Sequence, residues 1–547
     1  MLKGRKFLVR DWSVWLGWNN VRYTIETGLM LAKILDRELV LPAFTYSNTC
    51  EEDIEVCSKL LPKFDYNVPF DLRNVKDRFK YPDPNEGTTV LKPPVPTQNW
   101  YGWVIPTQEF LDIDHLLKNL KNNSIKFQDF LKLVDHGEKR SIGMNDGKWS
   151  TGYNNGLSYR AIPNEVFNNF SRTIVDRLPT PIKPLISKAM DNGTSNSTDQ
   201  TDLPIKLIEK CRLTLSRLDS TIPSRRMKRK RMIRRRDVTT NDDKRVPDWD
   251  LNLIQGDQML GELSSKDHSI LERCIASNGF RTAYGFTIDG WWMKAPYGPT
   301  KYVKRLSKMY GIHDELYNID EQVLHIQGEI HNGFPPASML WTTSEGREAY
   351  KDLVRRIIRP PEIYEIVAQR LELKVRKLCG GRSWRASHMR RGDFLGYEWT
   401  SKDINKQWEK IERGVNESIR LLEAEPDLVK PINKAFNTSL ELPRIDDPIY
   451  LATNTRLKEE LEFLKTKKVI LLKDLIDDED KSLLGVLRSS FMDTLAVLEQ
   501  CLIMRSAFFF GDAHSSVAGL ILNRRVFFGI DERLTKIEYF KIPGDGQ

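Results

Sequence analysis

The sequence predicts an α/β protein with two lobes, the second of which is a doubly wound nucleotide-binding domain. At 547 residues the chain exceeds the size at which a single hydrophobic core keeps growing. The first forty residues read as strand, helix and strand, and from residue 384 onward apolar strands alternate regularly with amphipathic helices. We therefore assign residues 1–340 to a first Rossmann-like lobe and 341–547 to a second.

The amino-terminal segment predicts a β-α-β unit. A strand over Phe7–Val9 is followed by a helix, and a second strand over Glu38–Leu41 stops at Pro42. The helix carries apolar residues at steps of three and four, at Val21, Ile25, Leu29, Ala32 and Leu35. Such a crossover packs on a parallel sheet and leaves its strand-to-helix turn, residues 16–22, accessible to a ligand.

The middle of the chain contains two polar stretches, 191–202 and 221–250, which predict a surface insertion at about 190–250 in the first lobe. The run 225–236 has nine basic residues, as many as the formal net charge of +9. Because no aromatic residues interleave it, we interpret it as a solvated loop and expect no nucleic-acid partner; a functional basic patch is the alternative. Order resumes at 270–279, and a strand over Val323–Ile326 is expected to close the first lobe.

The second lobe is predicted to begin with helical residues 344–378, interrupted at Pro360–Pro361, which lead into a strand over 384–388. The elements expected after it are a helix at 404–423, a strand at 449–453, a helix at 457–465, a strand at 469–472, a helix at 491–504, a strand at 507–510, a short helix from Ser515 and a last strand at 526–528. Domains of this kind bind ligands at the carboxyl ends of their strands.

The sharpest local signal is His388-Met389-Arg390-Arg391-Gly392-Asp393, where a strand runs directly into two arginines. The planar guanidinium of arginine holds phosphate oxygens through two parallel hydrogen bonds and keeps its charge. One arginine can face a ligand while its neighbour points the other way and pairs with Asp393. A purely structural ion pair is the alternative interpretation.

Two further turns carry polar groups after strands. Ser515 and Ser516 open a helix, where backbone N–H groups and hydroxyls form an anion site, although a simple serine N-cap explains them as well. In the turn from Gly17 to Arg22, Asn19 and Asn20 either contact a ligand or cap the helix.

Together these motifs resemble those of the GDP-fucose protein O-fucosyltransferase superfamily. Gly-Trp-Asn-Asn-Val-Arg at 17–22 resembles its G-x-N-Q-x-R turn, and His-Met-Arg-Arg-Gly-Asp looks like its H-x-R-R-x-D motif. The Ser515–Ser516 pair is similar to its third motif, and Tyr450–Asn454 resembles its A-T-D strand end. The resemblance covers almost the whole chain and is greatest to a fungal branch.

The resemblance implies a GT-B architecture, with two Rossmann-like domains and a cleft between them. It implies inverting, metal-independent transfer of fucose from GDP-fucose, the donor substrate, to a hydroxyl of a protein Ser/Thr or a glycan. By correspondence Arg390 is the catalytic residue and contacts the β-phosphate. The donor-binding residues that it implies are Gly17, Asn19, Asn20, His388, Arg391, Asp393, Asn454, Ser515 and Ser516.

The chain departs from the family at two positions. Leu16 stands where some members have a catalytic glutamate, so the turn provides no base, and Asn454 stands where aspartate is usual. Glu329 and His331 are candidates for acceptor contact or base, with a hinge hydrogen bond as the alternative. The missing base leaves a second function open, a catalytically inactive sugar-nucleotide or glycan-binding protein of the same fold.

Six cysteines show no CxxC spacing, which argues against a zinc site. Cys50 and Cys57 either form a local disulfide in an oxidising compartment or are unrelated thiols. Six Asn-x-Ser/Thr sequons and the family resemblance suggest the ER or Golgi lumen. Against this, the sequence shows no signal-type segment and no apolar run long enough to span a membrane.

Overall fold

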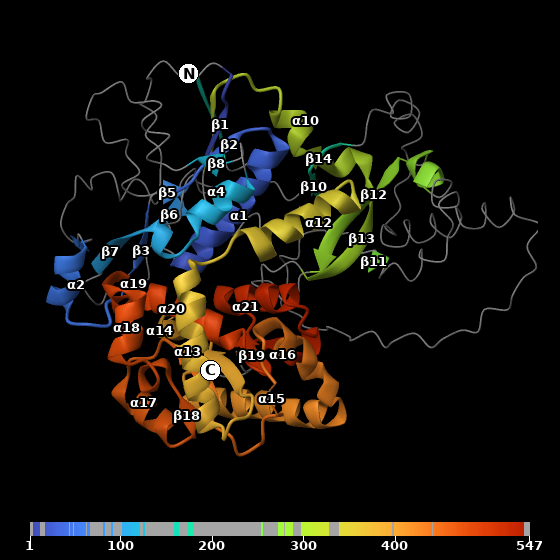
Figure 1. Cartoon of the computed structure of the whole chain (residues 1–547). Coiled ribbons are helices and arrows are strands. Elements are labelled where there is room, and N and C mark those ends of the chain that lie inside the picture. The colour runs from blue at the N-terminus through green and yellow to red at the C-terminus, as the bar shows by residue number, and fades with distance from the viewer. Residues whose placement is uncertain are drawn as a thin grey trace, which may run out of the picture.

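The computed structural model describes residues 4–10, 17–42, 44–47, 49–61, 63–65, 80–81, 89–90, 101–120, 124–125, 158–163, 173–178, 253–254, 272–277, 279–287, 297–327, 339–396, 399–439 and 441–540. These residues form two lobes, coloured blue to green and yellow to red in Figure 1. The polar stretches predicted as an insertion, the basic run, Leu16, Glu329 and His331 lie outside the described residues.

The first lobe is built on a five-stranded parallel sheet in the order β8-β2-β1-β15-β9. Its strands are β1 (Phe7–Arg10), β2 (Glu38–Val40), β8 (Ser124–Ile125), β9 (Tyr159–Ile162) and β15 (Val323–Ile326). Helix α1 (Trp18–Ile34) connects β1 to β2 and is buried along most of its length. The predicted β-α-β unit and the strand at 323–326 are therefore confirmed.

Smaller elements surround this sheet. They are β3 (Phe44–Ser47), β4 (Lys63–Asp65), β5 (Lys80–Tyr81), β6 (Thr89–Val90), β7 (Tyr101–Pro106), β10 (Thr173–Val175), β11 (Leu253–Ile254), β12 (Phe280–Thr287), β13 (Tyr297–Arg305), β14 (Met309–Gly311), α2 (Ile54–Leu60), α4 (Ile113–Asn119) and α10 (Ile312–Leu316). Strands β12 and β13 form an antiparallel hairpin, and β7 lies between β3 and β4.

The second lobe also has a five-stranded parallel sheet, in the order β18-β17-β16-β19-β20. Its strands are β16 (Arg385–Met389), β17 (Ile449–Thr453), β18 (Val469–Ile470), β19 (Phe508–Asp512) and β20 (Thr535–Glu538). The strand order reverses between β16 and β19. In doubly wound sheets a ligand binds at such a switch point, beside the carboxyl ends of the strands.

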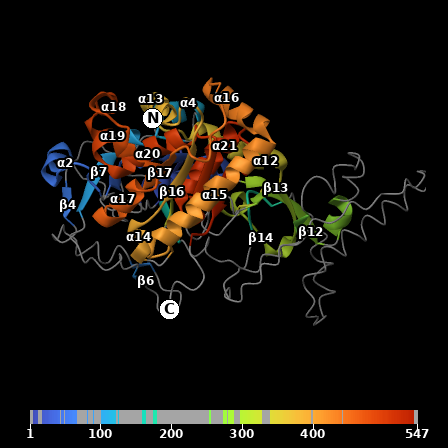
Figure 2. The same cartoon turned by 90° about the horizontal axis from the view of Figure 1, so that it is seen from below.

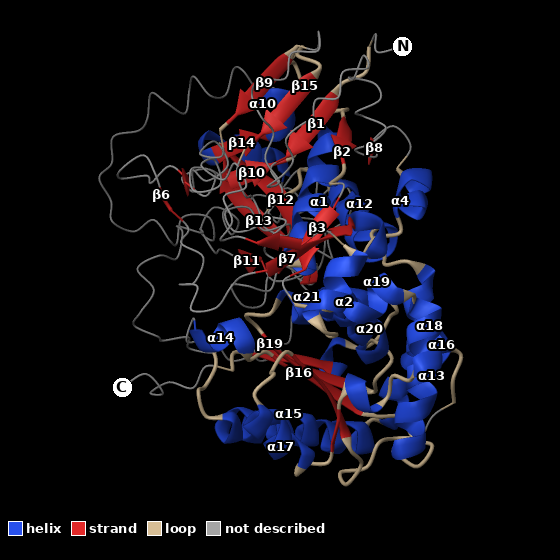
Figure 3. Ribbon diagram, turned by 90° about the vertical axis from the view of Figure 1, so that its left-hand side faces the viewer, coloured by secondary structure: helices blue, strands red, loops and turns tan. Residues whose placement is uncertain are grey.

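Helices cover both faces of the second sheet, as Figures 2 and 3 show. They are α13 (Glu362–Leu378), α15 (Ile404–Ala424), α16 (Lys430–Phe436), α17 (Lys458–Lys465), α18 (Asp478–Leu484), α19 (Val486–Ser490), α20 (Met492–Ile503) and α21 (Ser516–Phe527). Alternate residues of β19 enter different cores: Phe509 packs with α13 and α20, whereas Phe508 and Phe510 pack with α15. Burial on both faces explains why these strands read as continuous apolar runs. The α/β fold class with two Rossmann-like lobes is confirmed.

The two lobes are joined by a helical segment that breaks at the prolines. Helix α12 (Ser344–Asp352) continues into a π-helical turn, η5 (Leu353–Ile357), and α13 begins after Pro361. The interruption at Pro360–Pro361 is confirmed, since proline lacks the N–H that a continuing helix requires. The assignment of the lobes to 1–340 and 341–547 stays a prediction.

The last strand was predicted in the wrong place. Val526 and Phe527 belong to α21, which ends before Gly529 at φ +73°. Apolar, β-branched and aromatic residues of this kind are typical of a strand. Tertiary packing overrides this local preference, and the ring of Phe528 lies 5.0 Å from the ring of Phe436. The true last strand, β20, buries only Thr535 fully, so its sequence lacks an apolar signature.

A disulfide joins Cys50 to Cys57, which settles the alternative that the sequence left open. The segment that it closes lies against the second lobe, where Glu51 N donates to Ser490 O at 2.9 Å and Met492 N donates to Thr49 O at 3.1 Å. Cys379 and Cys501 are buried free thiols. None of the helices among the described residues is long and apolar enough to cross a membrane.

Candidate functional site

The second-lobe residues predicted to bind the donor gather at one edge of the second sheet. Met389 pairs with Thr453, and Ser387 pairs with Phe510, so the ends of β16, β17 and β19 lie side by side. The predicted groups follow these ends directly, at 390–393, 454 and 513–516. The site therefore lies at the switch point of the sheet.

The two adjacent arginines have different environments. Arg391 is 1% exposed, and its Nε donates to Glu460 Oε1 at 3.0 Å and to Oε2 at 3.2 Å. Its Nη1 donates to Ser401 O at 2.6 Å and to Gln407 Oε1 at 3.0 Å. Glu460 on α17 is thus a carboxylate partner of Arg391. The side chain of Asp393 lies outside the described part of the structure, so its expected pairing with an arginine stays a prediction. These contacts hold the guanidinium of Arg391 beneath the loop.

Arg390 lies on the loop itself and is partly exposed. Its guanidinium carbon lies 5.7 Å from the centre of the Phe394 ring, and its carbonyl accepts a hydrogen bond from Gln407 Nε2 at 3.3 Å. Gln407 thus contacts both arginines, through the backbone of one and the side chain of the other. The loop has one fixed cation below the surface and one at the surface.

Asn454 fixes the same loop from the neighbouring strand. Its Oδ1 accepts a hydrogen bond from Arg391 N at 2.7 Å. A Cβ atom on Gly392 would lie 2.4 Å from Asn454 Nδ2, so any larger residue would require this amide to shift. His388 is buried within β16 opposite Ala452, and Asp393 lies in the short helix α14 (Gly392–Gly396).

The third predicted motif lies at the amino end of α21. Ser515 is the N-cap residue, and Ser515 N donates to Asp512 O at 3.0 Å. Among the described residues its side chain makes no capping hydrogen bond, which disfavours the simple N-cap interpretation. The first N–H groups of this helix are aimed beyond its end, where the helix dipole favours an anion.

The first-lobe turn contacts this helix end. Gly17 has φ +79° and is the N-cap residue of α1, so Asn19 and Asn20 do not occupy the cap position. Tyr23 on α1 donates from its hydroxyl to Ser516 O at 3.2 Å, which brings the amino ends of α1 and α21 together. The Asn19 Oδ1 atom is buried and has no hydrogen-bond partner among the described residues.

Sequence reasoning missed an aromatic cluster beside Arg390. The rings of Trp399 and His514 are stacked, 5.6 Å apart and inclined by 13°, and His514 also meets Tyr539 edge-on at 4.7 Å. Phe394 contacts both Trp399 and His514. Phe394 directly follows the arginine motif and His514 directly precedes Ser515, whereas Trp399 and Tyr539 lie outside the motifs that the sequence singled out.

Asp512, at the end of β19, orients His514. Its Oδ1 accepts from His514 N at 2.9 Å and lies 3.3 Å from His514 Nδ1. Asp512 is fully buried, and its Oδ2 has no hydrogen-bond partner among the described residues. Within the same residues, no group of three or more His, Cys, Asp or Glu side chains is arranged to hold a metal ion.

The fold defines a two-lobed α/β protein with a five-stranded parallel sheet in each lobe. No family model and no curated protein matches the chain. Among solved structures it is similar to POFUT1 in complex with GDP, at 9% identity and a TM-score of 0.32, over 98% of this chain and 99% of that chain. It is also similar to POFUT1 in complex with GDP-fucose, at 11% identity and a TM-score of 0.30, over 98% of this chain and 99% of that chain. The NodZ α-1,6-fucosyltransferase soaked with GDP-fucose matches at 11% identity and a TM-score of 0.19, over 37% of this chain and 52% of that chain.

Proposed function

We propose that this chain transfers fucose from GDP-fucose to a hydroxyl acceptor, a protein Ser/Thr or a glycan, with inversion and without a metal ion. One observation carries the proposal. Arg390 lies partly exposed at the switch point between β16 and β19, on a loop whose neighbouring arginine is held in place by Glu460. The motif resemblance described from the sequence supports the choice of donor.

The chemistry explains why a fixed guanidinium belongs there. Breaking the bond between fucose and the diphosphate leaves positive charge on the sugar and negative charge on the leaving group. A cation held beside the diphosphate stabilises the transition state more than the ground state. Arg390 provides this charge at the β-phosphate, so the proposal needs no metal ion.

The remaining residues complete the proposed donor site. The N–H groups and hydroxyls of Ser515 and Ser516 contact phosphate oxygens from the opposite side, with support from the helix dipole. Gly17, Asn19 and Asn20 contact the donor sugar from the first lobe. The aromatic cluster around His514 keeps water away from one side of Arg390, which strengthens its interaction with phosphate. Arg391 and Asn454 act indirectly, because they hold the loop in position.

The acceptor proton has two routes in this proposal. The leaving diphosphate or a water relay takes it late in the reaction, or a carboxylate elsewhere in the site accepts it. Both routes agree with inversion, since the acceptor oxygen attacks the face of the sugar opposite the leaving group.

A donor screen tests the proposal. The purified chain is incubated separately with GDP-fucose, GDP-mannose, UDP-glucose and UDP-galactose, and free nucleotide is measured over time. We expect GDP release from GDP-fucose to be fastest, even without acceptor, through slow hydrolysis. GDP-fucose binding without any GDP release, with or without a hydroxyl acceptor, would instead support the inactive binding protein.

A further inference from the structure

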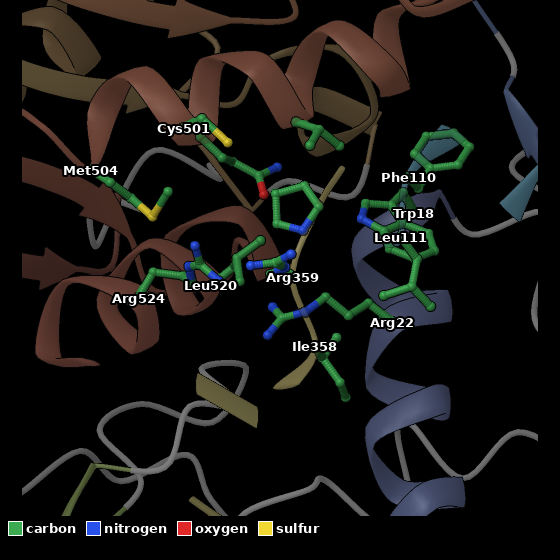
Figure 4. A pocket seen from close by; sticks show the side chains of 13 residues that line it. Trp18, Arg22, Phe110, Leu111, Ile358, Arg359, Cys501, Met504, Leu520 and Arg524 are labelled. Atoms are coloured by element: carbon green, nitrogen blue, oxygen red, sulfur yellow. The ribbon is translucent and has the colours of Figure 1, made fainter. Parts of the chain in front are cut away.

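A small cavity lies between the lobes, at the hinge, and a few polar side chains enter its largely apolar lining. It has a volume of about 20 Å³, and Figure 4 shows its lining. The first lobe contributes Trp18 and Arg22, the linker contributes Arg359, and the second lobe contributes Gln500 and Arg524. Both lobes and their connection therefore meet around one small space.

Three arginines converge on this space from three separate segments, as Figure 4 shows for Arg22, Arg359 and Arg524. Two of them have a close carboxylate partner. Arg22 Nη2 lies 2.6 Å from a Glu26 oxygen, and Arg359 donates from Nε and Nη2 to Asp112 Oδ2 at 3.1 and 2.8 Å. These pairs hold the two guanidinium groups at the edge of the cavity.

Arg524 is compensated much less. Its Nη2 lies 3.4 Å from Glu365, whose carboxylate also lies 3.3 Å from Arg505. The Nε atom of Arg524 is buried and has no hydrogen-bond partner among the described residues. Burial lowers the pKa of Arg524, and the nearby charges of Arg22 and Arg359 lower it further. Since Arg524 shares Glu365 with Arg505, its charge is compensated less closely than those of Arg22 and Arg359, and it is poorly solvated.

Gln500 adds a neutral donor to the same space. Its side chain is 3% exposed, and neither its amide nitrogen nor its amide oxygen has a hydrogen-bond partner among the described residues. Buried polar groups in folded proteins are nearly always satisfied, so a side chain left without a partner beside a cavity indicates a bound species.

We propose that this cavity binds one chloride ion, which accepts hydrogen bonds from Arg524 Nε and Gln500 Nε2. A cavity needs about 10–15 Å³ to hold one water molecule, so a volume of this size admits a single small ion and excludes phosphate or sulfate. Negative charge there compensates Arg524, whose Nε has no hydrogen-bond partner among the described residues. Because both lobes and the linker line the cavity, the bound ion stabilises their present arrangement.

Thermal unfolding of the full chain without donor tests the proposal. The midpoint is measured at constant ionic strength while sodium gluconate is replaced by sodium chloride. We expect the midpoint to rise with chloride and to saturate, as linkage requires for a single site. In the variants Gln500→Leu and Arg524→Lys, the chloride concentration that produces half of the rise in midpoint should be at least ten times that of the wild type. The matched control is Arg533→Gln, which removes an exposed arginine outside the cavity and should respond like the wild type.

An equal midpoint in both salts, or a rise that is the same in wild type and Gln500→Leu, overturns the proposal in favour of a bound water molecule. Substitutions in a buried cluster can prevent folding, so a second measurement uses the wild type alone. Crystals soaked in sodium bromide should show an anomalous peak within hydrogen-bonding distance of Arg524 Nε. Bromide peaks confined to surface arginines overturn the proposal. Neither measurement depends on fucosyl transfer.

Discussion

Glu460 accepts hydrogen bonds from Nε of Arg391 at 3.0 and 3.2 Å, and its carboxylate also accepts one from the hydroxyl of Thr455. Both Glu460 and Arg391 are buried. The pair fixes the backbone of the loop on which Arg390, the preceding residue, reaches the surface. Two arginines that are equivalent in the sequence therefore have different roles, one in support and one in the proposed chemistry.

Glu460→Ala should destabilise the protein by about 3–5 kcal/mol, because it leaves the charge of Arg391 buried without a counter-ion. Urea-induced unfolding at pH 7 measures the change. Glu462→Ala is the matched control on the same helix; its side chain is exposed and lies 4.0 Å from Lys465, so the expected change is within about 0.5 kcal/mol. Equal effects of the two substitutions would show that the buried pair contributes nothing specific.

Arg390→Ala should reduce the rate of GDP release from GDP-fucose by about a hundred- to a thousandfold, since it removes the cation beside the leaving diphosphate. The side chain is partly exposed, so the thermal midpoint should stay close to that of the wild type. Arg390→Lys should be impaired as well, because an ammonium group cannot reproduce a bidentate contact. A lysine variant with full turnover contradicts the proposed role.

Gly392→Ala should weaken donor binding about tenfold. The new methyl group must displace Asn454, and this breaks the hydrogen bond from Arg391 N that holds the loop. Isothermal titration with GDP measures the affinity. The double variant Gly392→Ala/Asn454→Ala has no amide to displace, so its loss of affinity should be smaller than the sum of the two single losses. Additive losses would mean that the contact does not position the loop.

The contribution of Glu26 to stability should fall as the pH rises from about 4.5 to 7. Burial raises the pKa of Glu26 to about 7, although Arg22 acts in the opposite direction. Between its pKa in the unfolded chain and this value the folded state binds more protons than the unfolded state, so each pH increase favours unfolding. Glu26→Gln should remove this dependence, because glutamine does not ionise. The unfolding free energy of the wild type, measured relative to that of the variant, should therefore fall by about 2–3 kcal/mol between pH 5 and pH 8. A constant difference across that range would show that Glu26 stays ionised in the folded protein.

Removing the Cys50–Cys57 disulfide should cost about 2–3 kcal/mol, the value expected for closing a short loop. The segment also carries Glu51, which pairs with Arg456 of the second lobe at 2.7 Å. Proteolysis of the Cys50→Ser/Cys57→Ser variant should therefore begin in this segment. The Glu51→Gln variant, which keeps the disulfide, is the control and should resist cleavage as the wild type does. Equal cleavage of both variants would mean that the ion pair, and not the disulfide, holds the segment.

Local patterns were sufficient for much of the second lobe. The strand at 449–453 and the helix at 404–423 follow from apolar periodicity. The strands predicted at 384–388 and 507–510 end one and two residues later in the structure, at Met389 and Asp512. Because the carboxyl ends of parallel strands meet at one edge, the sequence also places Arg390, Asn454 and Ser515 at one site. These features can be predicted because helices and strands have fixed backbone periods, which the spacing of apolar residues along the chain reflects.

Only the tertiary structure decided which arginine is buried, because the partner of Arg391 lies on a helix distant in sequence and its identity depends on packing. The same holds for the ring cluster of Trp399, His514 and Tyr539, and for the cavity where Arg22, Arg359 and Arg524 converge. The sequence determined the periodic elements and their polar ends. The partners of the buried charges come from residues distant in sequence, so only the folded structure determined them. A buried charge requires such a partner.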